Sequence, residues 1–147
     1  LVGSEMCIRD SHGEPPAILR FEDVKQEILG IFSIISSFKK SGYTSLGIVC
    51  KTETQARELS ESLRVHTGDI HFLSNQSSAF MKGIIVTSSH MAKGLEFDEV
   101  IVPYVNGKNY NSAIDKSMLY VAVTRAMHRL TLTYNGRPSE FIPVSVR

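Results

Sequence analysis

The alternation of apolar and polar positions along the chain predicts strands and helices that follow one another in turn. Short apolar runs, each bounded by polar or turn-forming residues, predict buried strands. These runs cover 17–21, 46–50, 70–73, 83–87 and 99–104. A last run, 130–134 with the sequence LTLTY, alternates apolar and polar residues and predicts a final strand.

Three helices are expected between these strands. In the first, apolar residues recur at steps of four and three, so they share one face, and acidic residues precede them while lysines follow. That face consists of Val24, Ile28, Ile31, Ile35 and Phe38. The second helix begins at a capping box formed by Thr52 and Gln55 and should run to about residue 64. A second capping box, Ser112 with Asp115, announces a helix over the stretch 118–129.

This order of elements predicts an α/β domain with a mainly parallel sheet covered by helices on both faces. In such sheets, ligands bind at the carboxyl ends of strands, in the loops that follow them. The turns after Cys50 and Thr87 are loops of this kind. No internal repeat or Pro/Gly-rich linker indicates a second domain.

The amino-acid composition narrows the class of protein only slightly. A chain of 147 residues that is 42% hydrophobic and 21% charged is long enough for one ordinary domain with a real core. Its formal charge of +1 gives no global electrostatic reason to bind nucleic acid or a membrane, so any such binding must come from local placement. No apolar run approaches the roughly 20 residues that span a bilayer. Cys7 and Cys50 form no CxxC pair and the histidines show no metal-site spacing, so we expect a cytoplasmic protein without disulfide or metal.

The first eleven residues are not predicted to form a helix or a strand. Residues 1–11 have neither a helical nor a strand period, and GSEMCIRDS resembles the translation of a sequencing-library adapter rather than natural sequence. An ordinary frayed terminus is the alternative. We therefore expect a non-native or disordered leader at 1–11 and one domain over 12–147.

A polar turn between two of the predicted strands carries Lys93, Gly94 and Glu96. Glycine lets the backbone turn tightly and approach a ligand, and a carboxylate accepts hydrogen bonds from hydroxyl groups. A solvated connection between strands is the plainer alternative. Lys51 and His90 lie at strand ends where they can contact a phosphate or a base, although a solvated surface also explains them.

Arg125 stands where the expected helix period favours an apolar side chain, because Met118, Val121 and Ala122 share its face. An arginine is rarely left fully buried without an anionic partner, so a carboxylate of this chain or an external anion should meet it. The alternative is an arginine at a helix end that extends its charged group into solvent and is favoured by the helix dipole.

The chain has no G-x-x-x-x-G-K-[ST] loop, which is the usual phosphate cradle of ATPases. Gly107-Lys108 is followed by Asn109 and lacks the upstream glycine. This chain by itself is therefore not expected to hydrolyse ATP.

Two motifs resemble those of a known family. Residues 90–97 (HMAKGLEF) are similar to motif V of the UvrD/Rep-like superfamily 1 helicases, and residues 119–126 (LYVAVTRA) are similar to their motif VI. Further similarity to the HelD or helicase IV branch lies in Asn109-Tyr110, 130–132 and 138–142. The resemblance implies the second RecA-like domain of a two-motor ATPase, truncated on its amino-terminal side.

The resemblance implies a nucleotide role for three residues. Arg125 would be an arginine finger that reaches the γ-phosphate of ATP, and Glu96 with the backbone at Gly94 would hold the ribose and phosphate side. ATP and Mg²⁺ would be bound mainly by the missing first domain, with none held by this chain alone. The motif IV arginine of the family has no counterpart here.

The resemblance also implies contacts to single-stranded DNA. His90, with Ser88 and Ser89, would lie against the strand, and Lys51-Thr52 would match the motif that grips its backbone. Ser88 departs from the pattern, because many UvrD-type motifs have threonine there.

The implied function is that of a motor domain in an ATP-dependent DNA helicase or translocase, whose partner is the amino-terminal RecA-like domain of the same protein. A HelD-like ATPase that remodels or recycles RNA polymerase is the first alternative. An inactive α/β binding module that kept the fold and lost the chemistry is the second.

Overall fold

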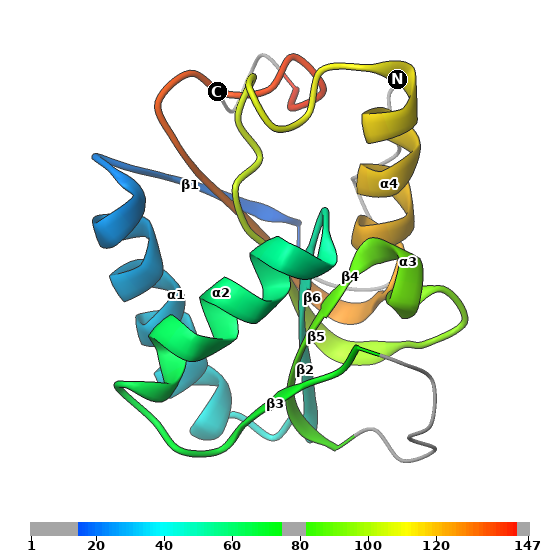
Figure 1. Cartoon of the computed structure of the whole chain (residues 1–147). Helices are drawn as coiled ribbons and strands as arrows, with labels where there is room; N and C mark the ends of the chain where they lie inside the picture. Colours follow the sequence, from blue (N-terminus) through cyan, green and yellow to red (C-terminus); the bar gives the residue numbers. More distant parts are fainter. Residues whose placement is uncertain (1–14, 75–81, 144–147) are drawn as a thin grey trace.

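The computed structural model describes residues 15–74 and 82–143. Within these ranges strands and helices alternate, largely as the sequence predicts (Figure 1). The strands are β1 (Ala17–Phe21), β2 (Ser45–Cys50), β3 (Ile70–Phe72), β4 (Gly83–Ser88), β5 (Phe97–Val102) and β6 (Ala126–Asn135). The helices are α1 (Val24–Lys39), α2 (Glu53–Arg64), α3 (Ser89–Ala92) and α4 (Ala113–Val123).

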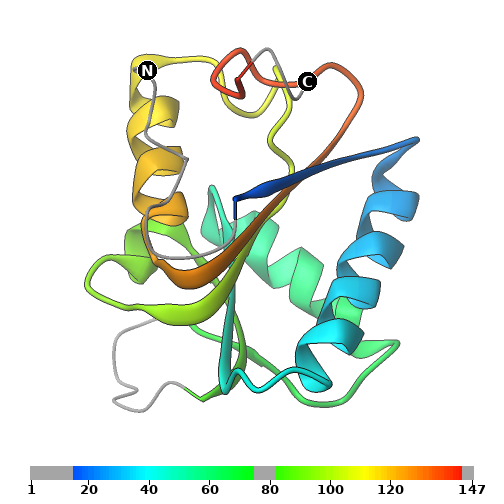
Figure 2. The same ribbon diagram turned by 180° about the vertical axis from the view of Figure 1, so that it is seen from behind.

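The strands form a single sheet in the order β1-β6-β5-β2-β4-β3, and every neighbouring pair is parallel. Helices α1 and α2 lie on one side of the sheet and α3 and α4 on the other (Figure 1). Figure 2 shows the same sheet from behind, with β1 running alongside β6. The predicted α/β class, with a mainly parallel and doubly covered sheet, is confirmed.

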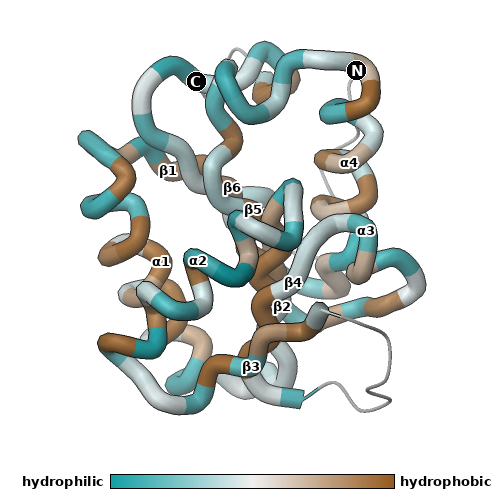
Figure 3. The backbone as a smooth tube through the Cα atoms, viewed as in Figure 1, coloured by the Kyte–Doolittle hydropathy of each residue, from teal (hydrophilic) through white to brown (hydrophobic). Residues whose placement is uncertain are grey.

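Each face of the sheet carries its own hydrophobic core, because successive side chains of a strand point to opposite faces. In β2, Leu46 and Ile48 share a core with α1 and α2, whereas Val49 shares the other core with Leu119 and Ala122 of α4. Figure 3 shows the hydrophobic positions gathered along the strands and on the inward sides of the helices. All six residues of β2 are buried, which makes this strand the centre of the fold.

Helix α1 starts where the predicted pattern starts. Asp23 is its N-cap, and the side chain accepts a hydrogen bond of 2.8 Å from the backbone N–H of Gln26. Ile31 and Ile35 are fully buried, as their spacing predicts. Val24, assigned to the same face, is half exposed because it lies in the first turn, beyond the edge of the sheet core.

The region 118–129 differs from the prediction. The helix ends at Val123, and residues 126–129 belong to strand β6. The hydroxyl of Thr124 donates back to the carbonyl of Tyr120 at 2.9 Å, and Ala126 pairs with Phe97 of β5. The apolar spacing is compatible with a longer helix, but residues 126–129 pair with a neighbouring strand instead. The prediction that Arg125 shares a helical face with Met118, Val121 and Ala122 is therefore wrong.

Smaller differences concern strand limits and one short helix. β5 runs from 97 to 102 rather than from 99 to 104, and β3 ends at residue 72. The four-residue helix α3 was not predicted. The expected leader 1–11 and most of the expected loop 74–79 lie outside the described residues. None of the helices in the described ranges has the length and apolar character needed to cross a membrane.

Candidate functional site

Glu96 and Arg125 lie side by side at the amino ends of two neighbouring strands. They directly precede Phe97 of β5 and Ala126 of β6, which are partners in the sheet, and the N–H of Phe97 donates to the carbonyl of Arg125 at 3.0 Å. Glu96 is exposed to solvent. The turn that leads to Glu96 passes through Gly94, whose φ of 82° lies in the left-handed region that favours glycine. The predicted nucleotide residues are therefore brought together.

The guanidinium of Arg125 is half-buried and bonded to neutral oxygens. Its Nε donates to the carbonyl of Val121 at 3.1 Å, and Nη1 donates to the carbonyl of Leu95 at 3.3 Å. Nη2 donates to the hydroxyl of Thr124 at 3.3 Å. The side chain thus satisfies one carbonyl in the last turn of α4, where the helix dipole also favours a cation, and one carbonyl in the turn before β5. No carboxylate of the described residues pairs with it, so its positive charge stays available for an anion.

The predicted nucleic-acid residues lie at the opposite, carboxyl edge of the sheet. Cys50 and Ser88 end paired strands, and the hydroxyl of Ser89 donates to the carbonyl of Lys51 at 3.3 Å. The hydroxyl of Ser88 accepts from the N–H of Met91 at 3.3 Å and caps α3. Both serines are buried, so they shape this edge from within.

Thr52 caps α2 at the same edge. Its hydroxyl accepts from the N–H of Gln55 at 3.2 Å, which is one half of the predicted capping box; the reciprocal bond from the N–H of Thr52 to the Gln55 side chain is not formed, so the full capping box predicted here is wrong. The Gln55 side chain donates to the Asn109 side chain at 2.9 Å and thereby ties α2 to the loop after β5. The capping box of Ser112 and Asp115 is complete in both directions.

Lys51 has strong partners within the chain. Its ammonium group lies 2.9 Å from a carboxylate oxygen of Asp115 and donates to the carbonyl of Asn109 at 2.6 Å. The pKa of the Asp115 carboxyl is held well below its ordinary value, first by the backbone N–H of Asn111 and then by Lys51. The side chains of this pair are only 20% and 11% exposed. In this structure the ammonium group of Lys51 is therefore occupied by contacts within the chain.

His90 is the exposed member of the predicted strand-contacting set, and it projects from α3 at the carboxyl edge. Lys93 is exposed as well, on the turn that leads away from this edge. The stretch 90–96 therefore divides between two surfaces: it begins beside Lys51 and ends beside Arg125.

One buried charged residue was missed by the sequence analysis. Glu27 of α1 is fully buried, and its carboxylate accepts hydrogen bonds from the hydroxyl of Thr133 at 2.6 Å and from the Asn135 side chain at 2.7 Å. It also accepts from the N–H of Tyr104 at 2.8 Å, a residue whose φ is 63°. The signal was present in the sequence, because Glu27 lies three residues after Val24 and four before Ile31 on the apolar face.

The parallel six-stranded sheet with helices on both faces is an α/β fold consistent with a RecA-like domain. Residues 83–133 match the family described as UvrD-like helicase C-terminal domain, and this segment contains both motifs. The resemblance to UvrD-like helicases is confirmed over that segment. The HelD branch and the RNA polymerase partner stay predictions. No protein of curated function matches the chain.

Solved structures of helicases and related ATPases share the fold. The C-terminal domain of a possible DNA helicase from Lactobacillus plantarum has a TM-score of 0.80 and 24% identity, over 91% of this chain and 84% of that one. The Sulfolobus solfataricus SWI2/SNF2 ATPase core, solved with double-stranded DNA, has a TM-score of 0.57 and 15% identity, over 80% of this chain and 27% of that one.

A third structure is the helicase of an arterivirus, nonstructural protein 10, solved with DNA. Its TM-score is 0.54 and its identity 16%, over 90% of this chain and 32% of that one. At these identities the likeness establishes the fold. This chain corresponds to most of the Lactobacillus domain and to about a third or less of the viral and Sulfolobus proteins.

Proposed function

We propose that this chain is the carboxyl-terminal motor domain of an ATP-dependent DNA helicase or translocase. The observation that carries the proposal is the pairing of Glu96 with Arg125 at the starts of β5 and β6, inside the segment that matches the helicase family. An exposed carboxylate beside a guanidinium without an anionic partner offers complementary groups to the hydroxyls and the phosphates of a nucleotide.

Arg125 supplies the charge for catalysis. A guanidinium carries five N–H donors, and the three hydrogen bonds that Arg125 donates from its side chain within the described ranges all go to neutral oxygens. The remaining donors and the positive charge can stabilise the negative charge that develops on the transferred γ-phosphoryl group. The hydrogen bonds to Val121 and Leu95 hold the side chain at the amino edge, so it needs little rearrangement to act as an arginine finger.

Glu96 and Gly94 orient the nucleotide. The Glu96 carboxylate accepts hydrogen bonds from the ribose hydroxyls, and the turn at Gly94 lets the backbone come close to the phosphates. The phosphate-binding loop and the Mg²⁺ site belong to a second RecA-like domain of the intact protein. Hydrolysis between the two domains then alternately closes and opens them along a DNA strand that runs over His90 at the carboxyl edge.

The decisive test is the rate of ATP hydrolysis by the intact protein with Arg125→Ala. Loss of an arginine finger lowers kcat by roughly 10³-fold or more, and the DNA-stimulated release of phosphate measures it. Arg20→Ala is the matched control, because Arg20 is exposed on the edge strand β1. Activity within a few-fold of the wild type for Arg125→Ala would refute the proposal.

A further inference from the structure

The pairing of β5 with β6 is irregular close to the proposed nucleotide residues. The register shifts between Phe97 and Glu99, although the pairs that follow advance in regular steps. In this interval β6 has one residue more than β5, because Met127 and His128 together lie opposite Asp98. Such an extra residue is a β-bulge, which is rare between parallel strands and is over-represented beside active sites, where it redirects a side chain.

The bulge decides which residue lies opposite Glu96. Counted back in regular steps from the pair of Glu99 and Arg129, that position would be taken by Ala126. The extra residue shifts the chain by one position, about 3.3 Å, so that Arg125 takes the place instead. A strand in the regular register would therefore present an alanine beside Glu96.

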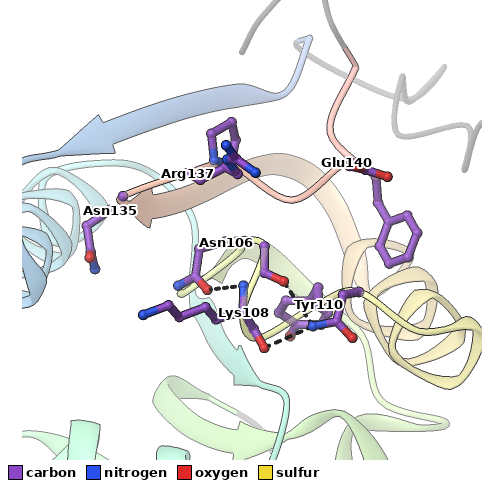
Figure 4. Close-up of a pocket in the computed structure, with 11 residues that line it drawn as sticks. Asn106, Lys108, Tyr110, Asn135, Arg137 and Glu140 are labelled. Carbon is purple, nitrogen blue, oxygen red and sulfur yellow. Dashed lines mark hydrogen bonds between the residues drawn. The ribbon is translucent and has the colours of Figure 1, made fainter.

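The remainder of β6 is held in place by β5 and by the loop that follows it. The N–H of Val105 donates to the carbonyl of Thr133 at 2.9 Å. Beyond the strands, the N–H of Gly107 donates to the carbonyl of Arg137 at 2.9 Å and joins the two loops that surround a pocket at the carboxyl edge (Figure 4). The extra residue is therefore accommodated at the amino end of the strand.

On the β5 side of the bulge, Asp98 is fixed to the start of β2. Its carboxylate accepts hydrogen bonds from the N–H groups of Thr44 at 2.8 Å and Ser45 at 3.3 Å. Its own N–H donates to the hydroxyl of Ser45 at 2.9 Å. Because these bonds hold β5 against β2, the irregularity falls on β6.

The ring of Tyr43, in the loop before β2, contacts two successive residues of β6. It stacks on the imidazole of His128 with ring centres 5.5 Å apart and an angle of 4° between the planes, and the guanidinium of Arg129 lies 4.9 Å from its centre. Neighbouring side chains of a regular strand point to opposite faces, so the bulge brings both within reach of one ring. Nε2 of His128 also lies 3.9 Å from a carboxylate oxygen of Asp98. These contacts favour the bulged strand over the regular one.

We propose that this bulge, held by Tyr43 and His128, sets the register that places Arg125 opposite Glu96. Tyr43 and His128 are therefore positioning residues for the arginine finger, and they act through β6, which begins directly after Arg125. The inference rests on the proposed function for what Arg125 does, whereas the register itself is a property of the fold.

The register is measured in the 147-residue chain, labelled with ¹⁵N and ¹³C, by NMR correlations through hydrogen bonds. In the wild type, the N–H of Phe97 should couple to the carbonyl of Arg125, to which it donates at 3.0 Å. In the double variant Tyr43→Leu with His128→Ala, this coupling should pass to the carbonyl of Ala126, the acceptor in the regular register. Leucine keeps an apolar side chain against the core beside α1 and α2, where the Tyr43 side chain packs.

Two results of this measurement would overturn the inference. A double variant that keeps the coupling to Arg125 would show that the ring contacts do not select the register. A double variant that unfolds would show that they hold the fold rather than the register. His66→Ala is the matched control, because His66 is also exposed and contacts one aromatic ring, that of Phe32 at 5.1 Å between centres; it should keep the wild-type coupling.

The intact protein gives the functional readout. Glu96 stays in place on β5 while Arg125 moves, so the double variant should lower kcat for ATP by roughly tenfold or more and change KM by less than about threefold. Deletion of Met127 from the double variant should restore most of kcat, because the shortened strand pairs regularly with Arg125 opposite Glu96. A loss of stability alone would not be repaired by removing a residue.

The two proposals fail in different ways. If Arg125→Ala is fully active, the proposed function is refuted, and the hydrogen-bond correlations still decide whether the bulge sets the register. If Arg125→Ala is inactive, an unchanged kcat in the double variant, or no recovery after deletion of Met127, would overturn the inference alone.

Discussion

The two edges of the sheet use polar side chains in different ways. At the carboxyl edge, Thr52 and Ser88 accept hydrogen bonds from the first turns of helices, and Lys51 is paired with Asp115. At the amino edge, Glu96 is exposed, and within the described residues Arg125 is bonded only to neutral oxygens. The side chains of the first set bond to other parts of the fold, whereas the charged groups of Glu96 and Arg125 can still bind a ligand.

A residue in a recognisable motif can therefore stabilise the fold as well as contact a ligand. Buried polar groups with several partners stabilise the native state, and their removal costs stability. Exposed groups with few partners contribute little stability, so their removal should be visible mainly in binding or catalysis. The comparison therefore predicts opposite consequences of substitution for these two sets of side chains.

The largest effect on stability is expected for Lys51→Ala. It leaves the mostly buried carboxylate of Asp115 without its cation, which costs about 3 kcal/mol in the free energy of unfolding. Urea unfolding measures the change. Lys25→Ala, an exposed lysine in the first turn of α1, should change stability by less than about 0.5 kcal/mol. Equal stability of the two variants would remove the contrast between partnered and exposed side chains.

The same pair gives a pH dependence. The pKa of Asp115 is lower in the folded chain than its ordinary value of 3.8, because the N–H of Asn111 and the ammonium of Lys51 favour the charged form. Such a carboxyl adds stability above its unfolded pKa, and this stability is lost as pH falls toward the folded pKa. The stability gap between the wild type and Asp115→Asn should be constant from about pH 7 to pH 5 and narrow below about pH 4. A gap that stays constant at about pH 3 would contradict this.

A moderate effect is expected for Gly94→Ala at the amino edge. The φ of 82° strains an alanine by about 1 to 2 kcal/mol, although no atom lies within 4 Å of the added carbon. Gly42→Ala is the control, because its surroundings are equally open and its backbone has no positive φ. Thermal unfolding of both variants separates backbone strain from steric contact. A Gly94→Ala variant as stable as the Gly42→Ala variant would show that the turn relaxes freely.

The smallest effect on stability is expected for Glu96→Ala, below about 0.5 kcal/mol, because the side chain is exposed. Nucleotide affinity of the intact protein should fall by about tenfold, the cost of about one charge-assisted hydrogen bond. Calorimetric titration with a non-hydrolysable ATP analogue measures this change. An unchanged affinity together with unchanged stability would make Glu96 a solvated surface residue.

Local patterns in the sequence predicted most of the fold. The spacing of Ile31 and Ile35, the N-cap at Thr52 and the capping box at Ser112 depend on contacts a few residues apart, so they can be identified without tertiary information. The residues assigned to the nucleotide, Glu96 and Arg125, lie next to each other, but their roles stay a prediction, and the helical face expected for Arg125 is wrong because the helix ends at Val123.

Features that depend on distant residues could not be found in this way. The helix was expected to continue through 126–129, but these residues pair with β5. The partners of Glu27 are more than 70 positions away, and Lys51 reaches Asp115 across the sheet edge. Hydrophobic period is a local signal, and strand pairing over long sequence distances competes with it.

The alternation of strands and helices, the N-cap residues of α2 and α4 and the helicase-like pair of motifs can all be identified in the amino-acid sequence without the structure. The tertiary structure alone decided that the polar stretch 90–96 divides between two edges and that, among the described residues, no carboxylate pairs with Arg125. The loops that follow β5 and β6 likewise enclose a pocket lined by Lys108 and Arg137, which are 29 positions apart in the sequence. The reason is physical: local propensity and capping act within a few residues, whereas the direction, burial and partner of a charge are set by packing between segments far apart in the chain.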